Sequence, residues 1–216
     1  MSYIVQRLIM IPIVLIALTF HEFCHGLVSS KLGDPTPRLT GRLTLNPLAH
    51  LDPIGTLLMI FTGFGWAKPV QINPGYYKKP KWGMALTALA GPISNFVLAF
   101  AAMLVYTIIH IINLKTGVFA GAMYQISYFV LLFAQVNLCF MVFNLIPIPP
   151  LDGSRVLGLF LSTSAYFKLQ RFERYSMILI IVLSFLNVFS VVIGTGVNFV
   201  LDGIINVCNL IVQAVI

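Results

Sequence analysis

The sequence predicts an all-α polytopic membrane protein, with four to six transmembrane helices and a small membrane-associated β-hairpin or sheet in the first long loop between them. Of its 216 residues, 59% are hydrophobic and only 9% are charged, whereas water-soluble domains are about 25% charged. The mean hydropathy is +0.96. These values argue against a water-soluble enzyme and against a disordered chain, which combines low hydrophobicity with high charge.

Long apolar runs bounded by charged residues mark the expected spans. A span needs about 20 apolar residues, and four runs are long enough: 3–30, 82–114, 116–151 and 175–193. The tail 194–216 is also apolar, but glycines and Asp202 interrupt it. It is therefore expected to form either a fifth span or an interfacial helix. We expect one membrane-embedded domain over 1–216, with the helices of 175–216 at its C-terminal end.

The positive charges predict how these spans are oriented. Of the 13 Lys and Arg residues, seven lie in 31–81 and four in 152–174, which leaves only Arg7 and Lys115 elsewhere. Lys and Arg collect in cytoplasmic loops, so both long loops should lie in the cytosol and the N-terminus outside. This orientation accounts for the net charge of +7, and we expect no nucleic-acid partner.

The first long loop contains the expected β-structure. Residues 38–45 partly alternate polar and apolar side chains, and 70–72 could form another short strand, which together predict a hairpin within 38–72. The apolar run 57–61 is too short to span a bilayer, so a re-entrant or interfacial segment and a surface hairpin both remain open. In the same loop, His50 and Asp52 could form a metal site or a turn with a polar anchor.

The most informative pattern is His21-Glu22-Phe23-Cys24-His25, which lies within the first predicted span. On a helix, His21 and His25 would lie about 40° apart on one face. Two imidazoles placed in this way can bind one Zn²⁺, with Glu22 as general base. Ionisable groups inside a membrane are costly and usually functional. The alternatives are histidines hydrogen-bonded to neighbouring helices beside a protonated Glu22, and Cys24 as either a soft ligand or a packing residue.

A second pattern follows the third run, at 144–153, and contains three prolines and then Asp152. Prolines break a helix, and irregular backbone at membrane depth is tolerated only where it is buried in protein or lines a wet cavity. A catalytic zinc has three protein ligands and one open position, so Asp152 could join His21 and His25. Alternatively, Asp152 could cap the next helix. The predicted topology places both regions near the cytosolic side.

A third pattern lies in the second span, where Gly91 and Asn95 are about one helical turn apart. A small residue permits close helix approach, and an Asn side chain can hydrogen-bond across helices. Helix packing and a catalytic role both remain open for this pair.

Together these three motifs resemble the site-2 protease family, the intramembrane zinc metalloproteases of peptidase family M50. The resemblance covers roughly residues 1–160, the expected catalytic core, and the chain looks like a minimal-core member. It implies Zn²⁺ held by His21, His25 and Asp152, with Glu22 as base and proton carrier. It further implies that Asn144 and Asn95 stabilise the oxyanion or orient substrate.

The resemblance also implies a transmembrane-helix protein as substrate, in regulated intramembrane proteolysis within a lipid bilayer. Two other classes remain open: a membrane metal transporter that uses the same His and Asp residues, and a non-catalytic membrane scaffold. The sequence leaves open the substrate, the cleavage position, the oligomeric state and the gating of substrate entry.

Overall fold

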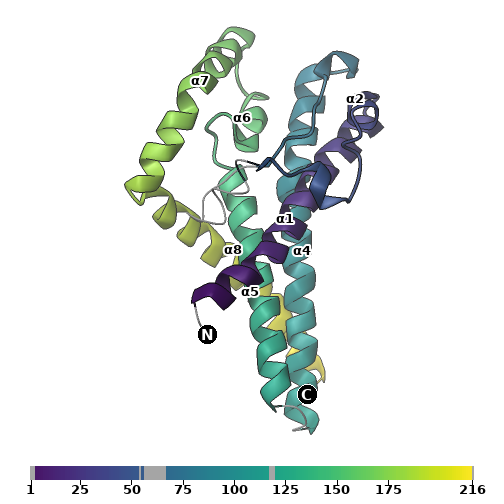
Figure 1. The fold of residues 1–216 in the computed structure, drawn as a ribbon, viewed down its shortest axis with the longest axis vertical. Coiled ribbons are helices and arrows are strands. Elements are labelled where there is room, and N and C mark those ends of the chain that lie inside the picture. The colour runs from purple at the N-terminus through teal and green to yellow at the C-terminus, as the bar shows by residue number, and fades with distance from the viewer. Residues whose placement is uncertain (1–2, 54, 56–66, 117–119, 216) are drawn as a thin grey trace.

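The computed structural model describes residues 3–53, 55, 67–116 and 120–215, and it is helical almost throughout (Figure 1). Its elements, in chain order, are α1 (Tyr3–Lys31), α2 (Thr36–Leu39), the short 3-10 helices η1 (Pro47–Ala49) and η2 (Pro74–Tyr76), α4 (Pro80–Thr116), α5 (Ala120–Asn144), α6 (Asp152–Leu157), α7 (Thr163–Phe185) and α8 (Val188–Val215).

Among the described residues, four helical segments are long and apolar enough to cross a membrane: Ile9–Lys31, Pro80–Thr116, Gln125–Asn144 and Val188–Ala214. The expectation of an all-α, multi-pass membrane protein is therefore confirmed. Figure 1 shows α4 and α5 side by side along much of their length, with α1 crossing them at an angle.

The boundaries of the last predicted span were wrong. The expected span 175–193 is interrupted, because α7 ends at Phe185 and α8 begins at Val188. Asn187 lies between them with a φ of 56°, a left-handed conformation that Asn tolerates better than most residues. The long apolar helix of this region is α8, which contains the tail 194–216 except its last residue.

The predicted β-hairpin is not found in the described part of 38–72. Residues 36–39 form α2, and the only pairing described there is an isolated antiparallel bridge between Leu51 and Ala67. Residues 70–72 belong to no helix or strand, and the Val70 N–H donates to the Glu22 carboxylate. A side-chain carboxylate thus accepts the backbone hydrogen bond that a neighbouring strand would accept in a sheet. The run 57–61 lies outside the described residues.

Small side chains bring the long helices close together. Ala99, Ala102 and Ala134 are buried in one cluster between α4, α5 and α8, and a second cluster joins Ile13 and Ala17 of α1 to α5. Small residues at such contacts let helix backbones approach closely. These packed clusters set the relative positions of α1, α4 and α5, the helices that surround the histidines.

Candidate metal centre

The two histidines of α1 share one face, as the spacing predicts. Both are buried, and their ring centroids lie 4.5 Å apart with the planes at 87°. This edge-to-face arrangement leaves the Nε2 atoms of both rings directed towards the start of α6.

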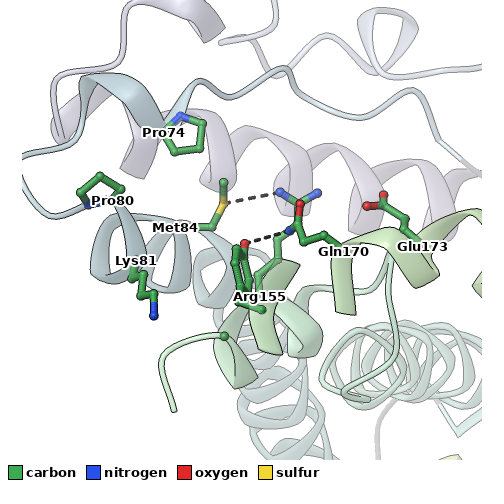
Figure 2. A pocket seen from close by; sticks show the side chains of 9 residues that line it. Pro74, Pro80, Lys81, Met84, Arg155, Gln170 and Glu173 are labelled. Carbon is green, nitrogen blue, oxygen red and sulfur yellow. Dashed lines mark hydrogen bonds between the residues drawn. The ribbon is translucent and has the colours of Figure 1, made fainter. Parts of the chain in front are cut away.

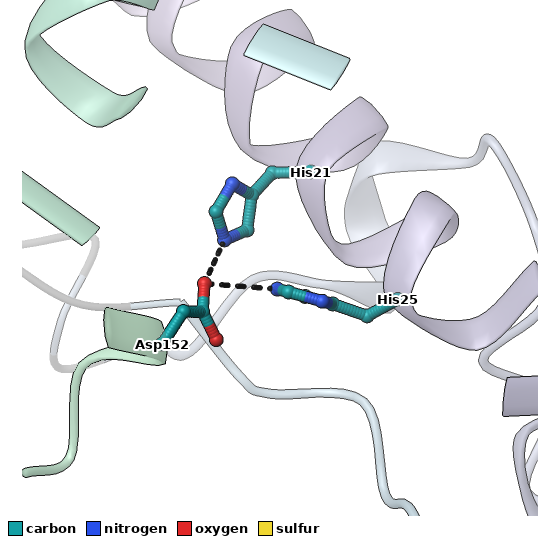
Figure 3. Close-up of side chains that lie close together, drawn as sticks. All are labelled: His21, His25 and Asp152. Atoms are coloured by element: carbon teal, nitrogen blue, oxygen red, sulfur yellow. Dashed lines mark hydrogen bonds and ion pairs between the residues drawn. The ribbon is translucent and has the colours of Figure 1, made fainter. Parts of the chain in front are cut away.

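Asp152 reaches both rings from the start of α6, as Figure 3 shows. Its Oδ2 lies 3.1 Å from His21 Nε2 and 3.2 Å from His25 Nε2. The capping alternative does not hold, because Leu151 is the N-cap of α6 and its side chain makes no cap hydrogen bond. Burial alone would raise the pKa of Asp152, but the two histidines outweigh burial and keep this pKa below its ordinary value.

The three side chains fit a zinc ion. One possible ligand atom from each lies within 4.8 Å of the others, and no other group of three His, Cys, Asp or Glu residues is found in the described part of the chain. Two imidazole nitrogens and one carboxylate form a ligand set of catalytic zinc. Gly91 of α4 leaves room for the rings, since a Cβ there would lie 2.5 Å from His21 Cε1 and from His25 Nε2.

The Nδ1 atom of each histidine ring lies within hydrogen-bond distance of an acceptor on α4. His21 Nδ1 lies 2.7 Å from Asn95 Oδ1, and His25 Nδ1 lies 2.7 Å from the Thr87 carbonyl oxygen. If each Nδ1–H donates, each Nε2 is free to bind a metal, as is usual for metal-binding histidines. The Thr87 carbonyl requires a proton on His25 Nδ1, because a carbonyl oxygen can only accept.

Asn95 contacts the Nδ1 side of the His21 ring, the side away from Asp152, and does not face solvent. It is fully buried, and its Nδ2 donates to the Ala17 carbonyl and to Asn137 Oδ1. With both amide hydrogens engaged, Asn95 has no donor left for a substrate oxygen. The expected role in stabilising an oxyanion is therefore not supported at Asn95, and this geometry favours positioning of His21.

Asn137 was not identified from the sequence. It is fully buried in α5 and joins the histidine site only through Asn95. An amide in the middle of a long charge-free span was a usable signal, because polar groups there need partners. Its partner depended on how α5 is rotated against α4, which the sequence pattern does not reveal.

Glu22 faces the segment 67–73, which precedes η2. Its Oε2 accepts a hydrogen bond from the Val70 N–H at 2.9 Å, and Val70 is buried. Asn144, the last residue of α5, donates its Nδ2 to the Phe140 carbonyl. No hydrogen bond from Asn144 to the histidines or Asp152 is present, so its catalytic role stays a prediction.

The remaining candidates have local partners. His50 is buried with its Nε2 2.9 Å from the Thr44 carbonyl, and Asp52 accepts a hydrogen bond from the Gly55 N–H. These contacts match a turn with a polar anchor. Cys24 is half-buried and does not belong to the group of possible ligands, which favours packing.

A second buried network ties the end of α1 to the segment before α4. Asp34, 1% exposed, accepts hydrogen bonds from Ser29 Oγ and from the N–H groups of Thr36 and Asn73. Tyr77 OH links Ser29 to Thr87 Oγ1, at 2.8 and 3.1 Å. Burial alone would raise the pKa of Asp34, but these hydrogen bonds lower it below its ordinary value.

A cavity of about 230 Å³ lies between the start of α4, α6 and α7 (Figure 2). Arg155 and Met84 line it, and Arg155 Nη1 donates to Met84 Sδ at 3.4 Å. The three possible metal ligands are not among its lining residues. Arg155 lies in the same short helix as Asp152.

The comparisons with known proteins agree with this geometry. Residues 107–187 match the model of peptidase family M50. The "Putative zinc metalloprotease YwhC" of Bacillus subtilis (strain 168) is 36% identical over 99% of this chain and 94% of its own length. The chain belongs to peptidase family M50. It is thus a zinc metalloprotease of the site-2 protease family.

Other M50 relatives are more distant. The "Putative zinc metalloprotease Rip2" of Mycolicibacterium smegmatis is 29% identical over 85% of this chain and 69% of its own length. The protein of the same name from Mycobacterium tuberculosis (strain H37Rv) is 28% identical over 78% of this chain and 63% of its own length. No solved structure gives a significant match to this M50 chain.

Proposed function

We propose that this metalloprotease hydrolyses peptide bonds within or near transmembrane helices of membrane proteins, with Zn²⁺ bound by His21, His25 and Asp152. The observation that carries the proposal is the convergence of two buried imidazoles and a carboxylate within 4.8 Å, on helices apolar enough to span a membrane. A substrate of this enzyme would therefore meet the site inside or close to the bilayer.

The chain supplies the acid–base chemistry. When bound, zinc would lower the pKa of a water to about 7 and polarise the scissile carbonyl. Glu22 would take the proton from the attacking water and pass it to the leaving amine. Asn144 would donate an amide hydrogen to the developing oxyanion, since one of its two is engaged with the Phe140 carbonyl and the other remains available.

Water would enter from the Asp152 side. The Asp152 side chain keeps 14% of its surface exposed, against 5% for His21 and 8% for His25. The cavity lined by Arg155, which belongs to the same short helix as Asp152, offers a volume for water nearby in the chain. We further propose that this end of the bundle faces the cytosol and the N-terminus lies outside, because the basic residues collect in the two long loops.

The segment 67–73 would hold the substrate. A transmembrane helix satisfies its own backbone groups, so an unwound stretch must find new hydrogen-bond partners. The segment runs beside Glu22, and its exposed Gln71 lies next to buried Val70. Pairing of the substrate backbone along this edge would keep the scissile bond extended near the base.

The test is co-expression with candidate single-span membrane proteins, comparing the wild type with Glu22→Gln. We expect the wild type to cleave a substrate and Glu22→Gln to retain zinc but lose about 10²–10⁴-fold in rate, the usual contribution of a general base. Wild-type levels of cleavage by Glu22→Gln would remove Glu22 from the mechanism. Zinc transport into vesicles without cleavage would favour a transporter instead.

A further inference from the structure

A chain of three hydrogen bonds runs from the backbone of α5 to a possible metal ligand. Asn137 Nδ2 donates to the Phe133 carbonyl at 2.9 Å, and Asn95 Nδ2 donates to Asn137 Oδ1 at 3.0 Å. Asn95 Oδ1 in turn lies 2.7 Å from His21 Nδ1. Asn95 and Asn137 are fully buried, so water cannot replace these partners.

The direction of every bond in this chain is determined by carbonyl groups that can only accept. The Phe133 carbonyl requires Asn137 to present its Nδ2, which turns Oδ1 towards Asn95. The Ala17 carbonyl, 3.2 Å from Asn95 Nδ2, and Asn137 Oδ1 both require hydrogens from Asn95. Asn95 Oδ1 is thereby turned towards His21, whose Nδ1 must carry the proton.

We propose that Asn137 is a positioning residue of the metal centre: through Asn95, it keeps a proton on His21 Nδ1, so that the neutral imidazole can present the lone pair of Nε2 to the zinc. The proposal rests on the proposed function, because it assumes that His21 is a ligand. Among the described residues, the side chain of Asn137 is hydrogen-bonded to Asn95 and to the Phe133 carbonyl, and to neither histidine. It acts by holding one amide group in one of its two orientations.

The consequence of losing Asn137 follows from the same geometry. If the Asn95 amide turned over, its oxygen would face two acceptors, the Ala17 carbonyl and Asn137 Oδ1. Without Asn137 only the longer contact to Ala17 opposes this rotation, and one Asn95 hydrogen is left without its partner. His21 could then hold its proton on Nε2, the atom that a metal needs free.

The experiment measures the zinc dissociation constant by chelator competition, using the full chain in lipid nanodiscs. Asn137→Leu has a similar size but no polar atoms, so we expect zinc binding to weaken about 10–100-fold, as for other groups behind metal ligands. In this buried position Asn137→Asp would be a neutral carboxyl group, which donates its hydrogen to the Phe133 carbonyl and still offers an acceptor to Asn95. It should therefore bind zinc within a few fold of the wild type. Equal weakening by both variants would overturn the proposal in favour of a packing role.

Thr107→Val is the matched control. Thr107 is also buried, and its Oγ1 donates to the carbonyl four residues earlier, as the Asn137 side chain does. It belongs to α4 but has no contact with the histidines. We expect it to lower the melting temperature of the metal-free protein without changing the zinc dissociation constant. A loss of zinc affinity equal to that of Asn137→Leu would contradict the proposal.

A measurement on the wild type covers the case in which Asn137→Leu does not fold. With ¹¹³Cd in place of zinc and ¹⁵N-labelled histidine, metal–nitrogen coupling should appear at His21 Nε2, with the proton on Nδ1. Coupling at Nδ1 would overturn the proposal. Absence of any metal from folded wild-type protein would instead refute the proposed function, so the two failures are distinguishable.

Discussion

At the scale of single residues, Gly91 decides whether two imidazole rings can lie against α4. A Cβ at this position would come within 2.5 Å of both rings, closer than packed atoms tolerate, and a rigid core yields little. We therefore expect Gly91→Ala to displace the histidines and weaken zinc binding at least about tenfold. Metal analysis of the purified variant after dialysis against a chelator measures this.

Gly194→Ala provides the control for Gly91→Ala. Gly194 is also helical, but a Cβ there would meet nothing within 4 Å. Alanine is favoured over glycine inside a helix by roughly 1 kcal/mol, so this variant should keep its zinc and unfold no earlier than the wild type. Wild-type zinc binding by Gly91→Ala would show that the rings do not need this glycine.

Residue spacing nominated His21 and His25, whereas Asp152 was nominated by the proline-rich run before it and by the third ligand that a catalytic zinc needs. His21 and His25 lie on one helix face because of helical periodicity, and Asp152 follows a proline-rich turn that returns the chain to the site. The partners behind the rings were harder to predict. Thr87 contributes a backbone carbonyl, which no side-chain motif can reveal.

At the scale of elements, side chains rather than a β-ladder hold the segment before α4 in place. Asp34 accepts the Asn73 N–H and Glu22 accepts the Val70 N–H. The alternation in 38–45 suggested a hairpin, but polar–apolar alternation cannot distinguish a strand from an irregular segment on a helical surface. Likewise, the last span was placed from its charges, whereas the chain turns at Asn187.

Asp34 gives this element a pH-dependent anchor. Its pKa is below the ordinary value of 3.8, so its stabilising effect is complete above that value and is lost as pH falls through the lower folded-state pKa. We expect Asp34→Asn to destabilise the protein by about 1.5–3 kcal/mol at neutral pH, the range for hydrogen bonds to charged groups. Melting temperatures of both proteins across acidic pH should converge as the pH falls.

The exposed Asp202 of α8 is the control for this anchor. Asp202→Asn should leave the melting temperature close to that of the wild type. If Asp34→Asn were as stable as the wild type at neutral pH, then Asp34 would not anchor the segment.

At the scale of the whole molecule, the orientation in the membrane determines which compartment reaches the site. In a cysteine-free background, we expect Leu114→Cys, at the end of α4 that the proposed topology places outside, to react with a membrane-impermeant thiol reagent in intact cells. Lys78→Cys, just before α4, should react only after the membrane is opened. The reverse labelling pattern would invert the proposed topology.

The central claim is that one zinc ion is held by His21, His25 and Asp152. Its most direct test is X-ray absorption at the zinc edge of the purified, folded protein, combined with metal analysis. We predict one zinc per chain, bound by two imidazole nitrogens and oxygen ligands, and its loss in Asp152→Ala. A folded wild-type protein without zinc, or a zinc ion bound by the Cys24 thiolate, would contradict this account.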